Sequence, residues 1–163
     1  MEKEFIQIIQ KNQGIIHKVC NIYCDEKEDR NDLFQEIVAQ LWKSFPSFRK
    51  ESKFSTWMYR VALNTAITSF KKVKRRPDQN RLTYDNFQIE DESYDTETEE
   101  NIKQLHRAVT QLTGVEKSIV LLYLENKKYE EIAEITGITQ NYVRVKMNRV
   151  KKKLKKLMAS EED

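Results

Sequence analysis

The side chains best placed for chemistry lie near the C-terminus, where amide and guanidinium groups repeat at helical spacing. They share one helical face and are Asn141, Arg144, Val145, Asn148, Arg149 and Lys152. Together they offer hydrogen-bond donors and positive charge along a single surface. A helix with such a face, entered through a tight turn, is the kind that binds in the major groove of DNA.

The residues before this face predict the turn that it needs. Tyr129–Thr136 forms a short helical run, Gly137 interrupts it, and Thr139 can cap a second helix through its side-chain oxygen. The apolar stripe opposite the basic face consists of Val143, Met147, Val150 and Leu154. This pattern predicts a helix-turn-helix. The alternative is an ordinary helical hairpin whose basic face is merely solvated.

A second polar stripe lies on a helix predicted for residues 54–74. It consists of Arg60, Asn64, Thr68, Lys71 and Arg75, and it leads into the basic run KKVKRR at residues 71–76. Cations at this spacing suit a phosphate backbone, because each one releases a counterion. The nearby aromatic residues Phe54, Trp57 and Tyr59 could stack on unpaired bases. Alternatively, the aromatic residues belong to the core and the basic run is a solvated helix end.

Composition limits the fold and the class of protein. The chain has 163 residues, of which 34% are charged and 39% hydrophobic, with three Gly and two Pro. So few chain breakers favour an all-α fold with a thin core. The longest apolar run, at residues 119–124, is too short to cross a bilayer, and the N-terminus lacks signal-peptide features. We therefore expect a cytoplasmic protein without membrane insertion, with both cysteines reduced.

Charge divides the chain into three segments. Residues 1–76 carry 15 Lys and Arg against 9 Asp and Glu, residues 77–100 carry 1 against 9, and residues 101–163 carry 13 against 8. The acidic middle segment is poor in branched apolar residues, which is typical of a flexible linker. We predict two small helical domains, 1–76 and 101–163, joined by this acidic linker.

The N-terminal domain is predicted to contain two helices before the helix at 54–74. Apolar residues repeat at helical spacing from Phe5 to Ile22, and Gly14 could interrupt them. A polar connection at residues 24–31 follows, and then a helix at residues 32–45 that Pro46 ends. Asp32 suits the cap or the first turn of that helix, because a carboxylate there opposes the helix dipole.

Three residues of the N-terminal segment have the types and spacing of metal ligands. His17, Cys20 and Cys24 share one helical face and could hold zinc, but the sequence offers no evident fourth ligand. Packing within a helix interface is the alternative reading of these three residues. No nucleophile–base set, phosphate loop or carboxylate pair is present in the sequence. We expect no cofactor, no small-molecule substrate and no enzymatic activity.

Three motifs in this order resemble the extracytoplasmic-function (ECF) group of bacterial RNA polymerase sigma factors over nearly the whole chain. DLFQEIVAQLW, at residues 32–42, resembles the helix of that family that docks onto the polymerase. The segment FRKESKFSTWMYRVALNTAITSFKK, at residues 48–72, is similar to the promoter-melting segment. YEEIAEITGITQNYVRVKMNRVKKKL, at residues 129–154, is similar to the second DNA-binding module.

The resemblance implies residue roles and partners. The residues implied in binding core RNA polymerase are Asp32, Gln35 and Glu36. Those implied in contacting the minus-ten promoter element are Phe48, Arg49, Lys50, Ser52, Trp57, Arg60, Asn64, Lys71 and Arg75. Those implied in reading the minus-thirty-five element are Thr139, Gln140, Asn141, Tyr142, Arg144, Val145, Asn148 and Arg149. Arg and Asn can bond purine edges, and Val145 could contact a thymine methyl group.

Three positions depart from the pattern of the family. Lys128 stands where a small hydroxyl residue often caps the first helix of the second module, so we expect that cap to be lost. Tyr142 and Val145 stand where Thr and Ser are usual, so the base preference of this chain should be its own.

The function implied is a sigma factor that binds core polymerase, directs it to specific promoters and assists their opening. An anti-sigma protein is a further implied partner. The alternatives are a stand-alone helix-turn-helix repressor or activator, which would need symmetry to read paired half-sites, and a helical adaptor that binds only proteins. Promoter affinity that hardly changes with salt would favour the adaptor.

Overall fold

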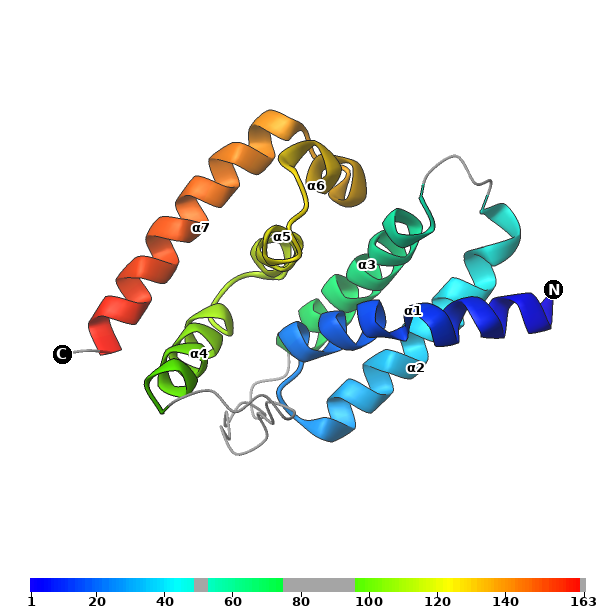
Figure 1. Cartoon of the computed structure of the whole chain (residues 1–163), viewed down its shortest axis with the longest axis horizontal. Coiled ribbons are helices and arrows are strands. Elements are labelled where there is room, and N and C mark those ends of the chain that lie inside the picture. Colours follow the sequence, from blue (N-terminus) through cyan, green and yellow to red (C-terminus); the bar gives the residue numbers. More distant parts are fainter. Residues whose placement is uncertain (49–52, 75–95, 162–163) are drawn as a thin grey trace.

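The protein is built from helices, as the computed structural model shows (Figure 1). The structure describes residues 1–48, 53–74 and 96–161, and of residues 71–74 and 160–161 it describes the backbone alone. The α-helices are α1 Glu2–Tyr23, α2 Lys27–Ser44, α3 Phe54–Lys74, α4 Thr96–Val109, α5 Gly114–Leu124, α6 Tyr129–Thr136 and α7 Gln140–Glu161. A short 3-10 helix, Phe45–Ser47, follows α2. The described ranges contain no strand, which confirms the predicted all-α class. Nor does any helix within them have the length and apolar character needed to cross a bilayer.

Helices α1, α2 and α3 form the N-terminal unit and enclose its core. Each contributes side chains that are fully buried, among them Ile16 of α1, Ile37 and Leu41 of α2, and Met58 of α3. These residues come from the apolar faces of amphipathic helices, so their burial accounts for the association of the three helices. The predicted helix at residues 54–74 is confirmed.

The interruption of α1 is at Asn12 and not at Gly14, so the sequence prediction was wrong on this point. Asn12 has non-helical backbone angles (φ −119°, ψ 16°), and its side-chain amide donates a 2.9 Å hydrogen bond to the carbonyl of Ile8. That carbonyl is the normal acceptor for the backbone N–H of residue 12 in a helix, so the side chain competes with the backbone.

Helix α2 begins earlier than predicted. It starts at Lys27, so most of the segment predicted as a polar connection is helical, and Asp32 lies beyond the first turn. Glu28 and Asp29 occupy the first turn, where their carboxylates oppose the helix dipole. Arg30 connects the first turns of α2 to the end of the preceding helix, because its Nε donates a 2.9 Å hydrogen bond to the carbonyl of Cys24.

Helices α4 to α7 form the C-terminal unit. Helix α5 begins with a capping box, in which the Thr113 hydroxyl accepts from the backbone N–H of Glu116 and the Glu116 carboxylate accepts from the N–H of Thr113. The same carboxylate lies 3.2 Å from Lys153 Nζ of α7. Burial of Glu116 opposes its ionisation, but the hydrogen bond from Thr113 and the ammonium of Lys153 together outweigh burial and lower its pKa. Glu116 therefore links α5 to α7.

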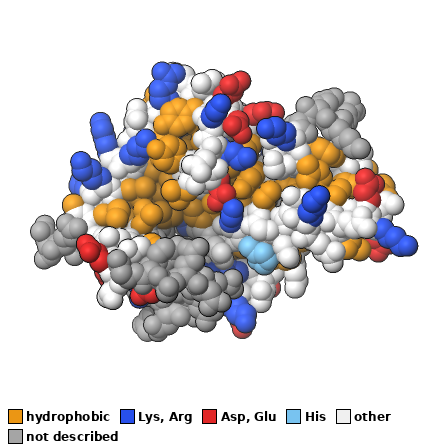
Figure 2. All heavy atoms as spheres, in the orientation of Figure 1, with side chains coloured by type: hydrophobic (Ala, Val, Ile, Leu, Met, Phe, Trp, Pro, Cys, Tyr) orange, Lys and Arg blue, Asp and Glu red, His pale blue; other side chains and the backbone are white. Residues whose placement is uncertain are grey.

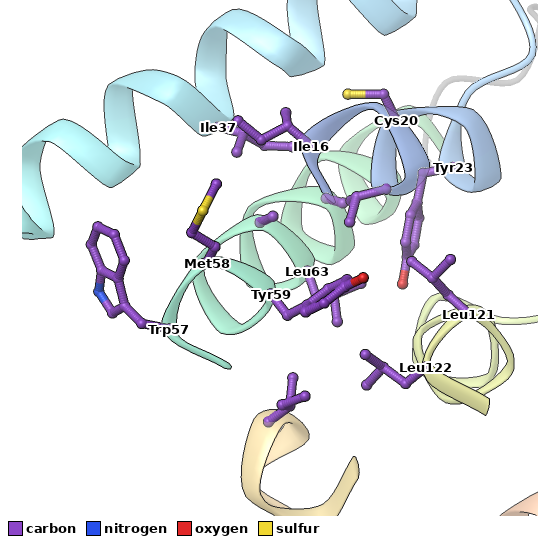
Figure 3. Close-up of a cluster of buried hydrophobic side chains, with 14 of the residues drawn as sticks. Ile16, Cys20, Tyr23, Ile37, Trp57, Met58, Tyr59, Leu63, Leu121 and Leu122 are labelled. Atoms are coloured by element: carbon purple, nitrogen blue, oxygen red, sulfur yellow. The ribbon is translucent and has the colours of Figure 1, made fainter. Parts of the chain in front are cut away.

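The two units pack against each other through α1, α3, α5 and α6. Figure 3 shows Tyr59 and Leu63 of α3 pointing toward Leu122 of α5, while Tyr23 of α1 lies beside Leu121. Buried side chains from both units belong to one continuous hydrophobic cluster. The predicted linker at residues 77–100 lies outside the described residues up to residue 95, and α4 occupies the rest of it from Thr96 onward.

Candidate functional site

The turn between α6 and α7 is built as the sequence predicts. Gly137 ends α6 in the left-handed region (φ 79°), which a glycine adopts without the steric cost of a side chain. The Thr139 hydroxyl accepts a 3.1 Å hydrogen bond from the backbone N–H of Tyr142 and so caps α7. Lys128 precedes α6 and makes no side-chain capping bond, which agrees with the expected loss of that cap.

Helix α7 presents one face to the core and the other to solvent. Val143, Met147 and Val150 are buried and Leu154 is half-buried, so the predicted apolar stripe is confirmed. The exposed side chains of the opposite face, here called the reading face, are Asn141, Tyr142, Arg144, Val145, Asn148 and Arg149. Lys and Arg side chains gather along the α7 side of the molecule (Figure 2).

Two unusual residues of the reading face are large and accessible. Tyr142 is 44% exposed and Val145 38% exposed. The ammonium of Lys146 lies 5.7 Å from the centre of the Tyr142 ring, close enough for a cation–π interaction. This contact brings a positive charge next to the Tyr142 ring on the exposed side of α7.

Removing the cap of α7 is expected to destabilise the helix-turn-helix. Thr139→Ala deletes the acceptor for the Tyr142 N–H and should lower the free energy of unfolding by about 1 kcal/mol. The effect should be read from chemical denaturation followed by circular dichroism. Thr139→Ser, which keeps the hydroxyl, is the control, and equal stability losses in the two variants would argue against a capping role.

Helix α2 carries the three residues that were predicted for docking from the motif DLFQE. Leu33, Ile37 and Leu41 turn into the core, which leaves Asp32, Gln35 and Glu36 exposed, here called the docking face. One carboxylate oxygen of Glu36 accepts a 3.0 Å hydrogen bond from the Ser69 hydroxyl of α3. Glu36 therefore also connects α2 to the helix that carries the second polar stripe.

The polar stripe of α3 is exposed where the structure describes it. Arg60, Asn64 and Thr68 face solvent. Lys71 lies within α3, but its side chain is not among the described ones, and Arg75 is outside the described residues. Three predicted loop residues, Arg49, Lys50 and Ser52, are also outside them.

An aromatic cluster forms where the chain enters α3. Phe48, Phe54 and Trp57 pack with ring centres 4.9–5.5 Å apart. Trp57 is only 7% exposed, so its ring faces its neighbours and not solvent. Its burial favours the core alternative for this residue. Phe48 is half-buried and lies directly before the loop at residues 49–52.

A set of polar contacts between the two units was not predicted from the sequence. Across this interface, Lys18 Nζ lies 2.7 Å from a Glu125 carboxylate oxygen, and His106 Nε2 lies 3.2 Å from an Asp25 carboxylate oxygen. The hydrogen bond with His106 holds the pKa of Asp25 below its usual value, although partial burial acts in the opposite direction. The partners are far apart in sequence, and no local pattern marks them.

Arg60 also takes part in this interface. Its Nη2 donates a 2.8 Å hydrogen bond to the backbone carbonyl of Glu134 near the end of α6. The predicted DNA contact at the start of the α3 stripe is therefore bonded to the first helix of the helix-turn-helix.

The three candidate zinc ligands have separate environments. His17 lies against the ring of Phe34, with 4.8 Å between ring centres, and Cys20 is buried in the core. Burial raises the pKa of Cys20 to about 11 and that of Cys24 to about 12, so both thiols stay protonated near neutral pH. The burial of Cys20 in the core and the contact of His17 with Phe34 favour the packing alternative.

Comparison with known proteins places the chain in a family. The family descriptions that match are "Sigma-70 region 2" over residues 8–76 and "Sigma-70, region 4" over residues 102–154. The RNA polymerase sigma factor SigV of Bacillus subtilis is 31% identical, with 97% of this chain and 92% of that protein covered. The ECF RNA polymerase sigma-E factor of Haemophilus influenzae is 30% identical, with 92% of this chain and 85% of that protein covered.

Two solved structures share the fold. The sigma factor RpoE in complex with the anti-sigma factor NepR from Bartonella quintana matches with a TM-score of 0.75 at 17% identity, over 96% of this chain and 98% of that one. CnrH in complex with the cytosolic domain of CnrY matches with a TM-score of 0.70 at 14% identity. The match covers 98% of this chain and 90% of the CnrH chain. The shared fold agrees with the helical architecture described above. The chain belongs to the ECF group of RNA polymerase sigma factors, the proteins that direct RNA polymerase to promoters.

Proposed function

We propose that this sigma factor works through three surfaces: the docking face of α2 for core RNA polymerase, the α3 stripe with Phe48 for the minus-ten element, and the reading face of α7 for the minus-thirty-five element. The observation that carries the proposal is that the described polar residues of each face are exposed on helices whose apolar stripes are buried. Burial of the apolar stripe orients the helix, so the polar side chains are held in position before any partner binds.

The docking face suits a basic protein surface. Asp32 and Glu36 supply negative charge and Gln35 supplies an amide, and all three are exposed on a helix that the core holds firmly. Charge complementarity of this kind speeds encounter and fixes the register between partners. We assign this face to core polymerase.

The minus-ten surface combines cations with an aromatic entrance. Arg60 and Asn64 are exposed on α3, and Lys71 and Arg75 continue the same stripe in sequence. Arg49, Lys50 and Ser52 follow Phe48, and we assign this loop to the capture of a base flipped from the duplex. Flipping a base costs a few kcal/mol of stacking free energy. Binding of the extruded base in a pocket can offset this cost. Trp57 packs against Phe48, with 4.9 Å between ring centres, and we assign assistance of promoter opening to this end of α3.

The reading face determines promoter choice in this proposal. Arg144, Asn148 and Arg149 can bond base edges, and Val145 can contact a thymine methyl group. Thr139, Gln140, Asn141 and Tyr142 stand at the start of α7, and the start of a recognition helix is the part that contacts base edges most directly.

Arg144→Ala tests the reading face. We expect the variant to relax specificity at one promoter position, at about 1–3 kcal/mol, because one base-edge contact is lost. Binding to a library of single-base promoter variants measures this. Lys152→Ala is the comparison, because Lys152 is exposed further along α7. This variant should instead weaken binding to all sequences of the library equally and reduce the salt dependence of binding. A uniform loss for Arg144→Ala would mean that this residue contacts phosphate.

Regulation by an anti-sigma protein completes the proposal. Of the two solved structures named above, one contains the anti-sigma factor NepR and the other contains the cytosolic domain of CnrY. Their fold extends over nearly all of this chain, which supports a comparable partner here. We place the protein in the cytoplasm, where RNA polymerase acts, and assign catalysis to the polymerase alone.

A further inference from the structure

The reading face of α7 carries two apolar side chains among its polar ones. We propose that Tyr142 and Val145 together recognise C5-methyl groups, so that the upstream promoter element of this factor contains two thymines that lie one or two base steps apart. This inference rests on the assignment of the reading face to the minus-thirty-five element under the proposed function. It adds the class of base that two residues of the face select.

Tyr142 and Val145 are neighbours on the surface of α7. Residues three positions apart in a helix lie on the same face, with about 5–6 Å between their Cβ atoms. Both side chains are exposed, and among the described side chains of α7 no other large hydrophobic one is. They therefore form a single apolar surface, here called the apolar pair.

The apolar pair is held where a recognition helix approaches the bases. The backbone of Tyr142 is fixed at the start of α7, because its N–H donates a 3.1 Å hydrogen bond to the Thr139 hydroxyl. Arg144 and Asn148 are exposed beside Val145, and both are residue types that bond purine edges. A duplex that brings its base edges to these two polar groups also brings them to the apolar pair.

Base edges offer one apolar group to such a surface. In the major groove the C5-methyl group of thymine is apolar, whereas the other features that distinguish the base pairs are hydrogen-bond donors and acceptors. Val145 has no side-chain hydrogen-bonding group, so a polar edge placed against it would lose water without gaining a partner. The apolar pair therefore favours thymine through contact and disfavours other bases through desolvation.

The separation of the two side chains limits the spacing of the two thymines. Successive base pairs of B-DNA rise by about 3.4 Å. Two side chains with about 5–6 Å between their Cβ atoms can therefore reach base pairs one or two steps apart, but not base pairs at opposite ends of an element.

Removal of single methyl groups from the promoter tests the proposal in the holoenzyme. The probe is the upstream element that the full chain with core polymerase selects from a randomised duplex library. Each thymine of that element is replaced in turn by deoxyuridine, which lacks only the C5-methyl group, and competition binding measures each Kd. Two substitutions, one or two base steps apart, should each weaken binding about fourfold, as expected for one buried group of this size. The other substitutions should leave Kd unchanged.

Variants of the apolar pair assign the two effects to their residues. Val145→Ala should abolish the discrimination between thymine and deoxyuridine at one of the two positions, and Tyr142→Ala should abolish it at the other. Tyr142→Phe removes the hydroxyl alone and should keep the discrimination. The matched controls are Val115→Ala and Tyr123→Ala, which truncate similarly exposed side chains of α5, outside the reading face. Both controls should discriminate as the wild-type factor does.

Three results would overturn the proposal. They are a selected element without thymines at this spacing, equal binding of thymine and deoxyuridine at every position, and discrimination that survives both Ala variants of the apolar pair. Arg144→Ala separates these results from failure of the proposed function. If this variant relaxes specificity for the selected element while methyl groups have no effect, the reading face keeps its role and the apolar pair loses its own. If the holoenzyme selects no upstream element at all, both assignments are wrong.

Discussion

Replacing Gln35 and Glu36 together by Ala is expected to abolish most run-off transcription with purified core polymerase. Both side chains are exposed on α2 while Leu33, Ile37 and Leu41 anchor the helix, so the fold should be unaffected. Loss of an amide and a carboxylate at the centre of a docking surface should cost about 2 kcal/mol or more, which is at least roughly 30-fold in Kd. Direct titration of labelled polymerase measures the affinity, and transcription from a genomic promoter library measures its consequence.

Two controls distinguish docking from an internal effect. Ser69→Ala removes the 3.0 Å hydrogen bond to Glu36 but leaves the carboxylate in place, so it should retain polymerase affinity. Glu4→Ala with Gln13→Ala removes the same two chemical groups from exposed positions of α1. Unchanged polymerase affinity in the Gln35 and Glu36 variant would refute the docking assignment. An equal loss in Ser69→Ala would mean that Glu36 acts by joining α2 to α3.

Leu122→Ala should be among the most destabilising single truncations in the protein. Leu122 is fully buried (0% exposed) in α5, where Tyr59 and Leu63 of the N-terminal unit point toward it (Figure 3). Truncating a buried Leu removes apolar contacts and leaves a cavity, which costs about 2–5 kcal/mol. Urea denaturation followed by circular dichroism measures the change.

The same helix provides the control for this prediction. Leu124 is 55% exposed, and Leu124→Ala should change the free energy of unfolding by less than about 0.5 kcal/mol. Because the hydrophobic cluster extends through both units, Leu122→Ala should also loosen the contact between them and increase the radius of gyration. Similar stability losses in the two variants would argue that Leu122 is not part of a packed core.

The local elements were predictable because their signals are local. Tyr129–Thr136 and Phe54–Lys74 were predicted with the bounds that the structure has, since apolar residues at helical spacing lie between clear boundaries such as Gly137. The start of α2 was missed because Lys27 and the residues after it are polar helix formers without an apolar period. Gly14 was predicted as the position that could interrupt α1, whereas the non-helical residue is Asn12, whose side chain donates a hydrogen bond to the carbonyl of Ile8.

In the candidate sites, too, features with a local sequence signal were predictable and the others were not. The exposed face of α7 was predicted from periodicity, because a side chain opposite a buried stripe must face outward, whereas the docking residues of α2 were predicted from the resemblance of their motif. The burial of Trp57 was left open, since an aromatic residue on a helix is compatible with either environment. The bond between Arg60 and Glu134 could not be predicted, because its acceptor is a backbone carbonyl, which every residue carries.

The sequence by itself determined that this protein is helical, which faces of its helices are polar, and that its motifs resemble those of ECF sigma factors. Only the tertiary structure decided how the two units meet. An apolar period shows that a face is buried but not which partner covers it. The interface combines buried apolar side chains of both units with long-range polar contacts, such as the ion pair of Lys18 with Glu125. These contacts join residues that are distant along the chain, so they exist only once both units have folded.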